Sequence, residues 1–143
     1  MTVADLAPET PIVLLAGGLV FLWALALGVV KYAQIRRSPG AAAHPYIDIA
    51  HRSALLYAFA IGLIAVFAEL SDWPTWVDLT AALVQIAFFV AAIASYQWHG
   101  LRRDTDNQLR EPSAAIGWFM AALIIGEVGG FAVLLAGFVH AWA

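Results

Sequence analysis

The sequence predicts an all-α integral membrane protein built as a bundle of four helices. Of its 143 residues, 63% are hydrophobic and only 12% are charged, with a mean hydropathy of +0.83. These values lie far outside the range of soluble globular domains. Four apolar stretches are each long enough to cross a hydrocarbon core of ~30 Å, which takes ~20 helical residues. Little chain remains between them, so we expect one transmembrane domain over residues 1–143.

The first helix is predicted at residues 11–34, on a background of Leu, Val and Ala. It ends at Lys31 and Tyr32, with Arg36 just beyond, which is an ordinary interfacial anchor. The residues from Met1 to Glu9 carry two acids and no base, unlike the positive segment that begins a secretory signal. We therefore expect this helix to be retained.

The second and third helices are predicted at residues 46–70 and 75–99, and the fourth at 113–140. Pro45 suits the first turn of the second helix, with His44 just before it. The link between the second and third helices contains only a few polar and aromatic residues around Pro74. So short a link makes these helices antiparallel neighbours, with the start of one level with the end of the other.

Charge distribution predicts the orientation in the membrane. All seven bases lie in or beside the first and third links, whereas Asp5, Glu9, Glu69, Asp72 and Asp78 lie toward the opposite side. By the positive-inside rule the basic links are cytoplasmic, which puts both termini outside in a multi-pass protein of the inner membrane. The bases are Lys31, Arg36, Arg37, Arg52, Arg102, Arg103 and Arg110.

Composition and motifs exclude several kinds of chemistry. The chain has no cysteine, which excludes disulfides, thiolate catalysis, Fe–S clusters and cysteine-based zinc sites. It also lacks the P-loop, HExxH, GxSxG and Rossmann signatures. The expected partners are the lipid bilayer and a small hydrophobic substrate, with no nucleic acid.

A possible metal site begins the second helix. His44, Asp48 and His51 follow one another at four and three residues, so they share one stripe of that helix. A carboxylate one turn from an imidazole can orient it as a metal ligand. Alternatively, His44 caps the helix, the negative charge of Asp48 interacts favourably with the positive end of the helix dipole, and His51 lies among the lipid headgroups. Arg52 either reaches lipid phosphate or pairs with a ligand anion such as a propionate.

The third helix places Gln85, Ala92, Tyr96 and His99 on one face, because their offsets return to nearly the same angle. Antiparallel packing then brings Tyr96 and His99 to the same membrane depth as His51. There Tyr96 could orient or protonate a substrate oxygen. The alternative for this group is a belt of interfacial aromatic residues.

Two further polar features need an explanation. Glu127 lies near the middle of the fourth helix among glycines, where an unpaired charge is costly. Either Glu127 has a structural role, in which it forms a hydrogen bond between closely packed helices, or it takes part in the protein's function. Asn107 lies in a polar cluster, residues 104–108, for which a solvated loop is the default interpretation.

Ala50 and His51 open the second helix, Tyr96 comes near the end of the third, and Asn107 and Gln108 precede the fourth. This order of features resembles the styrene oxide isomerase family. These are small four-helix membrane enzymes similar in architecture to the MAPEG proteins. The resemblance covers roughly residues 50–108, and Tyr57 stands where the family has an asparagine.

The resemblance implies a homotrimer that binds haem b between subunits, with a ferric iron that acts as a Lewis acid on an epoxide oxygen. It makes His51 the axial ligand. The expected function is a redox-neutral epoxide isomerase. The candidate residues are His51 and His99 for the metal, Arg52, Asp48, Gln85 and Asn107 for the cofactor, and Tyr96, Tyr57 and Glu127 for catalysis.

Three alternatives remain open. Two histidines, His51 with His99 or His44, could ligate haem from both sides for electron transfer with a quinone. A cofactor-free glutathione enzyme of the MAPEG type could use Arg52 and the Arg102–Arg103 pair. A non-catalytic subunit or small transporter could use Glu127 as a proton-linked carboxylate.

Overall fold

The structure is a computed structural model that describes residues 2–110 and 113–143. After a short 3-10 turn at Val3–Asp5 come α1 (Glu9–Arg37), α2 (Pro45–Glu69), α3 (Thr75–Arg102) and α4 (Ala114–Trp142). All four are long and apolar enough to cross a membrane, and no strand occurs among the described residues. The prediction of an all-α bundle of four membrane helices is confirmed.

Helices α1 and α3 continue about one turn beyond their predicted ends. The backbone of the polar residues that follow an apolar span continues the helical hydrogen bonds, because helix length is not limited by the hydrocarbon thickness. Helix α3 stops where Arg103 takes a left-handed conformation, with φ of 55°. At the start of α2, the His44 ring accepts a hydrogen bond from the backbone N–H of Tyr46 over 3.2 Å, so His44 does cap this helix.

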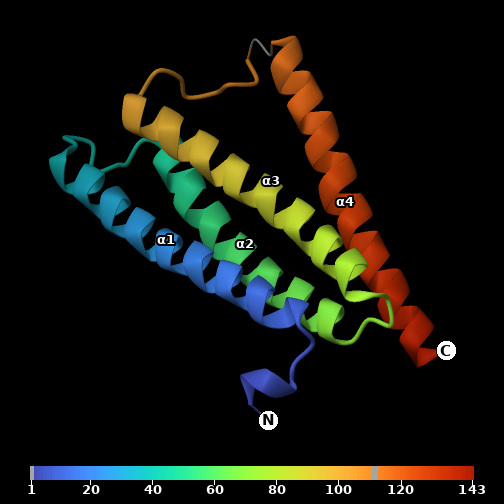
Figure 1. Cartoon of the computed structure of the whole chain (residues 1–143). Coiled ribbons are helices and arrows are strands. Elements are labelled where there is room, and N and C mark those ends of the chain that lie inside the picture. The colour runs from blue at the N-terminus through green and yellow to red at the C-terminus, as the bar shows by residue number, and fades with distance from the viewer. Residues whose placement is uncertain (1, 111–112) are drawn as a thin grey trace.

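The helices α1, α2 and α3 lie side by side, and α4 packs on the outside of α3 (Figure 1). We call the end that holds Lys31, Arg52 and Arg102 the basic end, and the end that holds Glu9, Glu69 and Asp78 the acidic end. Helix α4 approaches α3 near the acidic end and diverges from it toward the basic end (Figure 1).

Glycines allow the close approach of α4. A Cβ on Gly126 would collide with the Phe88 ring, and one on Gly130 would come within 2.9 Å of the Ala81 carbonyl oxygen. Trp73, in the α2–α3 link, donates its ring N–H to the Val133 carbonyl over 3.0 Å. Only 11% of the most apolar stretch of α4 is buried, against 44% for α3. Helix α4 therefore offers most of its apolar surface to lipid or to another protein.

At the acidic end a carboxylate joins α1 to α2 by hydrogen bonds. The Glu69 carboxylate at the end of α2 accepts hydrogen bonds from the Thr10 hydroxyl over 2.6 Å and from the Ala7 N–H over 3.0 Å. These bonds fix the start of α1 against the end of α2. Asp78 and Glu9 are buried at the same end.

Candidate functional site

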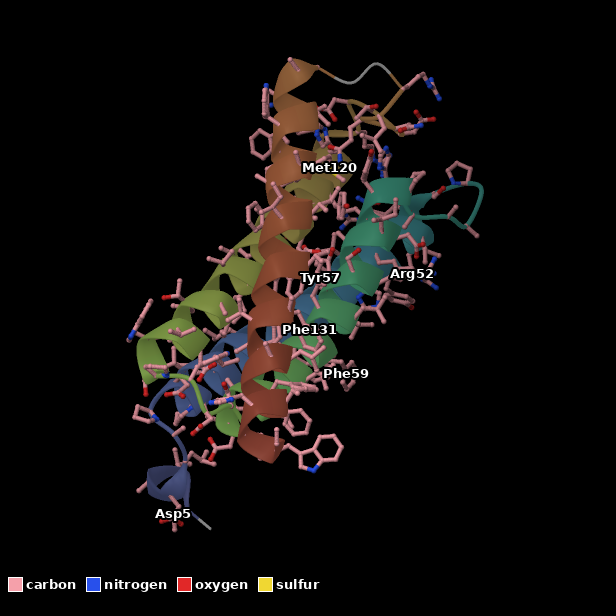
Figure 2. The ribbon with its side chains drawn as sticks, turned by 90° about the vertical axis from the view of Figure 1, so that its right-hand side faces the viewer. Asp5, Arg52, Tyr57, Phe59, Met120 and Phe131 are labelled. Atoms are coloured by element: carbon pink, nitrogen blue, oxygen red, sulfur yellow. The ribbon has the colours of Figure 1, made fainter. Side chains whose placement is uncertain are left out.

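A cleft between α2, α3 and α4 is the first candidate site. Its volume is about 450 Å³, within the usual range for small-molecule pockets. It exists because α4 diverges from α3 on this side of the bundle, and Figure 2 shows Tyr57 between α2 and α4, with Met120 on α4 nearer the basic end. The lining residues are Tyr57, Ala91, Ala92, Ser95, Tyr96, His99, Gln108, Ala115, Ile116, Phe119, Met120 and Leu123.

The cleft has a polar side and an apolar side. Helix α3 and the following link contribute hydroxyl, imidazole and amide groups, from Ser95, Tyr96, His99 and Gln108, whereas α4 contributes only apolar side chains. The predicted face of the third helix is confirmed for Ala92, Tyr96 and His99, all of which line the cleft. The arrangement suits a lipid-soluble molecule with a hydrogen-bonding group.

Tyr46 organises the basic end of the cleft. Its ring stacks on Tyr96 with centroids 5.9 Å apart and lies 5.6 Å from the ring of His99. Its hydroxyl accepts a hydrogen bond from the backbone N–H of Gln108 over 2.7 Å. Sequence reasoning treated Tyr46 only as the start of α2. The sequence contained one indication of this role, because Tyr46 at the start of α2 is level with Tyr96 near the end of the antiparallel helix α3.

Glu127 lies just beyond the lining of the cleft, deeper in the bundle. It follows Leu123 by one helical turn on the same face of α4. The preceding residue of α4, Gly126, packs on Phe88 of α3. Tyr57 stacks on the next residue of α3, so Glu127 and Tyr57 lie at one level of the bundle. The Oε1 atom of Glu127 is buried and has no hydrogen-bond partner among the described residues.

His51 lies on a different side of α2, against α1. Its Nδ1 is 2.9 Å from the Ala24 carbonyl oxygen, and because a carbonyl only accepts, Nδ1 carries the proton. The lone pair of Nε2 is then left free. Opposite the ring, α1 has Gly28, on which a Cβ would come within 3.0 Å of the ring carbon Cε1. Since His51 and Tyr57 are six residues apart, they lie about 120° apart around α2.

The structure therefore separates candidates that the sequence suggested would meet. Tyr57, Tyr96 and His99 line the cleft and Glu127 lies one helical turn beyond it, whereas His51 faces α1. One chain brings together the tyrosines and the carboxylate but does not place them at the His51 ring. They could join His51 only across a contact between two copies.

Asp48 and Arg52 form an ion-pair group with Lys31. Asp48 lies 2.5 Å from the Lys31 ammonium and 3.6 Å from the Arg52 guanidinium. The Asp48 carboxylate thus ties the end of α1 to the start of α2 and does not orient His51. Arg52 is largely exposed and points away from α4 (Figure 2), so it remains accessible to an anion from the surroundings.

The other two cofactor candidates make local bonds. Gln85 is buried and donates from Nε2 to the Ala81 carbonyl, one turn earlier, over 3.0 Å. The Asn107 side chain accepts from the Leu109 N–H over 2.9 Å, which shapes the α3–α4 link. Both side chains therefore stabilise the local backbone structure.

His99 is tied to the α3–α4 link by Asp104. The imidazole Nδ1 lies 2.8 Å from a carboxylate oxygen of Asp104. This hydrogen bond, together with the charge of His99, holds the pKa of Asp104 below its ordinary value of 3.8. The bond positions the imidazole at the mouth of the cleft.

Replacing Asp104 with Asn should loosen the α3–α4 link. We expect hydrogen exchange of the backbone amides in residues 103–109 to rise by about two- to five-fold, as befits an exposed pair. The wild-type link should loosen in the same way in acid. A carboxyl whose folded pKa is lowered stabilises the fold above its ordinary pKa, and this contribution is lost as the pH falls through the lowered value. Exchange in Asp104→Asn equal to that of an Asp72→Asn control would contradict this role.

A single axial haem ligand is compatible with the residues around His51. An imidazole that donates from Nδ1 to a backbone carbonyl and keeps Nε2 free is the usual arrangement of a metal-bound histidine. The described residues contain no cluster of three or more His, Cys, Asp or Glu that could hold a metal ion without a prosthetic group. His44 accepts a hydrogen bond at Nδ1, so its Nε2 carries the proton, whereas His99 donates from Nδ1 to Asp104 and, like His51, keeps Nε2 free. Within one chain His99 lines the cleft and His51 faces α1.

Comparison with known proteins found no matching family model, no matching curated protein and no matching solved structure.

Proposed function

We propose that this protein is a haem b-dependent membrane isomerase, with His51 as the axial ligand. The supporting observation is the hydrogen bond from His51 Nδ1 to Ala24, which fixes the tautomer and leaves Nε2 free to bind iron. The resemblance to the styrene oxide isomerase family supports the same assignment. The substrate class is a small hydrophobic epoxide or related oxygenated compound.

The chain's own residues would bind the cofactor and exclude water. Arg52, exposed on the turn next to His51, can pair with a propionate. Apolar helices supply a dry surface for a lipid-soluble substrate. Ferric haem would supply a Lewis acid to polarise the substrate oxygen. Conversion of an epoxide to a carbonyl compound moves a hydride within the substrate and needs no external electron donor.

The proposal includes a homotrimer in the inner membrane, with the basic end in the cytoplasm. The positive-inside rule supports the orientation. The exposed apolar surface of α4 and the family resemblance support an oligomer. A contact between copies is also the arrangement that could bring His51 of one copy toward the cleft of another.

The visible absorption spectrum tests the haem assignment. We expect protein purified in mild detergent, without added haem, to show a strong Soret band that shifts on reduction with dithionite. His51→Ala should lose most of this band, and imidazole added to that variant should restore part of it. His140→Ala is the matched control, because His140 stacks on Trp73 at the acidic end.

Two results would overturn the proposal. One is folded wild-type protein with no Soret band that also takes up no added hemin. The other is an unchanged band in His51→Ala. If haem is bound, incubation with an aryl epoxide under nitrogen, without a reductant, should yield the isomeric carbonyl compound.

A further inference from the structure

Three polar groups in or beside the cleft have no hydrogen-bond partner among the described residues. Oε1 of Glu127 is buried without a hydrogen bond among the described residues. Tyr57 and Tyr96 line the cleft, and their hydroxyl groups form no hydrogen bond within residues 2–110 and 113–143. Unsatisfied polar groups in a membrane interior are costly. Their gathering at one cavity indicates that a ligand satisfies them.

The two tyrosine rings are held in place by stacking. Tyr57 stacks on Phe89 with centroids 4.2 Å apart and an interplanar angle of 9°. Tyr96 stacks on Tyr46, whose own hydroxyl is engaged with the link after α3. Fixed rings present their hydroxyl groups in fixed directions, which lowers the cost of ordering them around a ligand.

The chemistry of the three groups defines what they can bind. A carboxylate accepts hydrogen bonds, and a phenol donates one readily. No Lys or Arg lines the cleft, so an anionic ligand would have no counter-charge there. One alcohol group meets both requirements, because its O–H donates to Glu127 while its oxygen accepts from Tyr57 or Tyr96.

We propose that the cleft between α2, α3 and α4 binds a lipid-soluble alcohol, with its hydroxyl group at Glu127, Tyr57 and Tyr96 and its hydrocarbon part against Phe119, Met120 and Leu123. The apolar side of the cleft belongs to α4, whose outer surface is exposed to lipid, so the ligand enters from the bilayer between α3 and α4. Within one chain the site lies apart from His51, and alcohol binding there needs no haem.

Equilibrium binding in nanodiscs tests the site, with menthol, its methyl ether and menthylamine as probes and empty nanodiscs as the blank. Menthol should bind about ten-fold or more tightly than the ether, which lacks the donor. Glu127→Leu should abolish this preference, whereas Glu127→Gln, which retains an amide oxygen, should keep part of it. Tyr57→Phe and Tyr96→Phe should each weaken menthol binding about three-fold or more. Val128→Leu, on the exposed side of α4, is the control and should bind as wild type.

Several outcomes would overturn the inference. Equal binding of menthol and its ether would exclude a hydroxyl site, and tighter binding of menthylamine would replace the alcohol with a cationic amine. An unchanged preference in Glu127→Leu would remove the carboxylate from the site. If Glu127→Leu does not fold, unchanged menthol binding in both tyrosine variants would equally overturn the inference. Because this assay measures no haem property, its failure leaves the isomerase proposal unaffected. Likewise, failure of the haem test leaves the alcohol-binding proposal unaffected.

Discussion

Substitution of Gly100 with Leu should destabilise the bundle more than any other single change at the basic end. A Cβ at Gly100 would lie 2.7 Å from the backbone nitrogen of Ile47 and 2.7 Å from its Cγ1 atom. A backbone nitrogen moves only if the first turn of α2 moves. That turn is held by the His44 cap and by Gln34, which accepts from the His44 N–H over 2.9 Å and donates to the Gly100 carbonyl over 3.4 Å.

We expect Gly100→Leu to lower the free energy of unfolding by about 1–3 kcal/mol. The corresponding fall in melting temperature is about 4–12 °C, measured by circular dichroism in one detergent. Gly100→Ala should show part of this fall, since the Cβ alone is already too close. Gly62→Leu is the matched control, because a Cβ there meets nothing within 4 Å. Equal melting temperatures for Gly100→Leu and Gly62→Leu would show that the helices separate here without cost.

Most of the fold follows from hydropathy. Apolar runs of membrane-spanning length predict four helices whatever their packing, and the short link around Pro74 makes α2 and α3 antiparallel. The His44 cap was also foreseeable, because Pro45 suits the first helical turn. Local chemistry decides all these features, so the sequence contains enough information to predict them.

The rotation of the helices about their own axes was not predictable to the same degree. Helices α1 and α4 are apolar on every side, so no hydrophobic stripe says which face meets a neighbour. Sequence reasoning placed His51 level with Tyr96, but glycine and alanine positions on α1 turn the imidazole toward Ala24. The side chains that define these faces are too small to give a periodic signal.

The candidate site was predictable in part. The spacing of Ala92, Tyr96 and His99 correctly gave the face that lines the cleft. The cleft itself depends on the divergence of α4 from α3, which results from close packing at Gly126 and Gly130 and none nearer the basic end. Sequence reasoning left the role of Glu127 open, and only the fold brings its helix next to Tyr57 (Figure 2).

Under the proposed function, Gly28→Leu should weaken haem binding although Gly28 itself supplies no ligand. A Cβ on Gly28 would lie 3.0 Å from Cε1 of His51, 3.5 Å from Nδ1 and 3.7 Å from Nε2. A larger side chain must therefore push the imidazole away from α1. That displacement breaks the hydrogen bond to Ala24, which fixes both the tautomer and the direction of Nε2.

Loss of such a supporting bond lowers metal affinity by about 10- to 100-fold. We expect the Soret absorbance per protein to fall accordingly in Gly28→Leu, and less in Gly28→Ala, where the ring need give way by only a few tenths of an ångström. Gly18→Leu, on the same helix with nothing within 4 Å of its Cβ, should keep the full band. A full, unshifted band in Gly28→Leu would mean that iron binds elsewhere. A band lost in Gly28→Leu and kept in Gly18→Leu would locate the cofactor at the α1–α2 surface, since Gly28 affects the site only through the His51 ring.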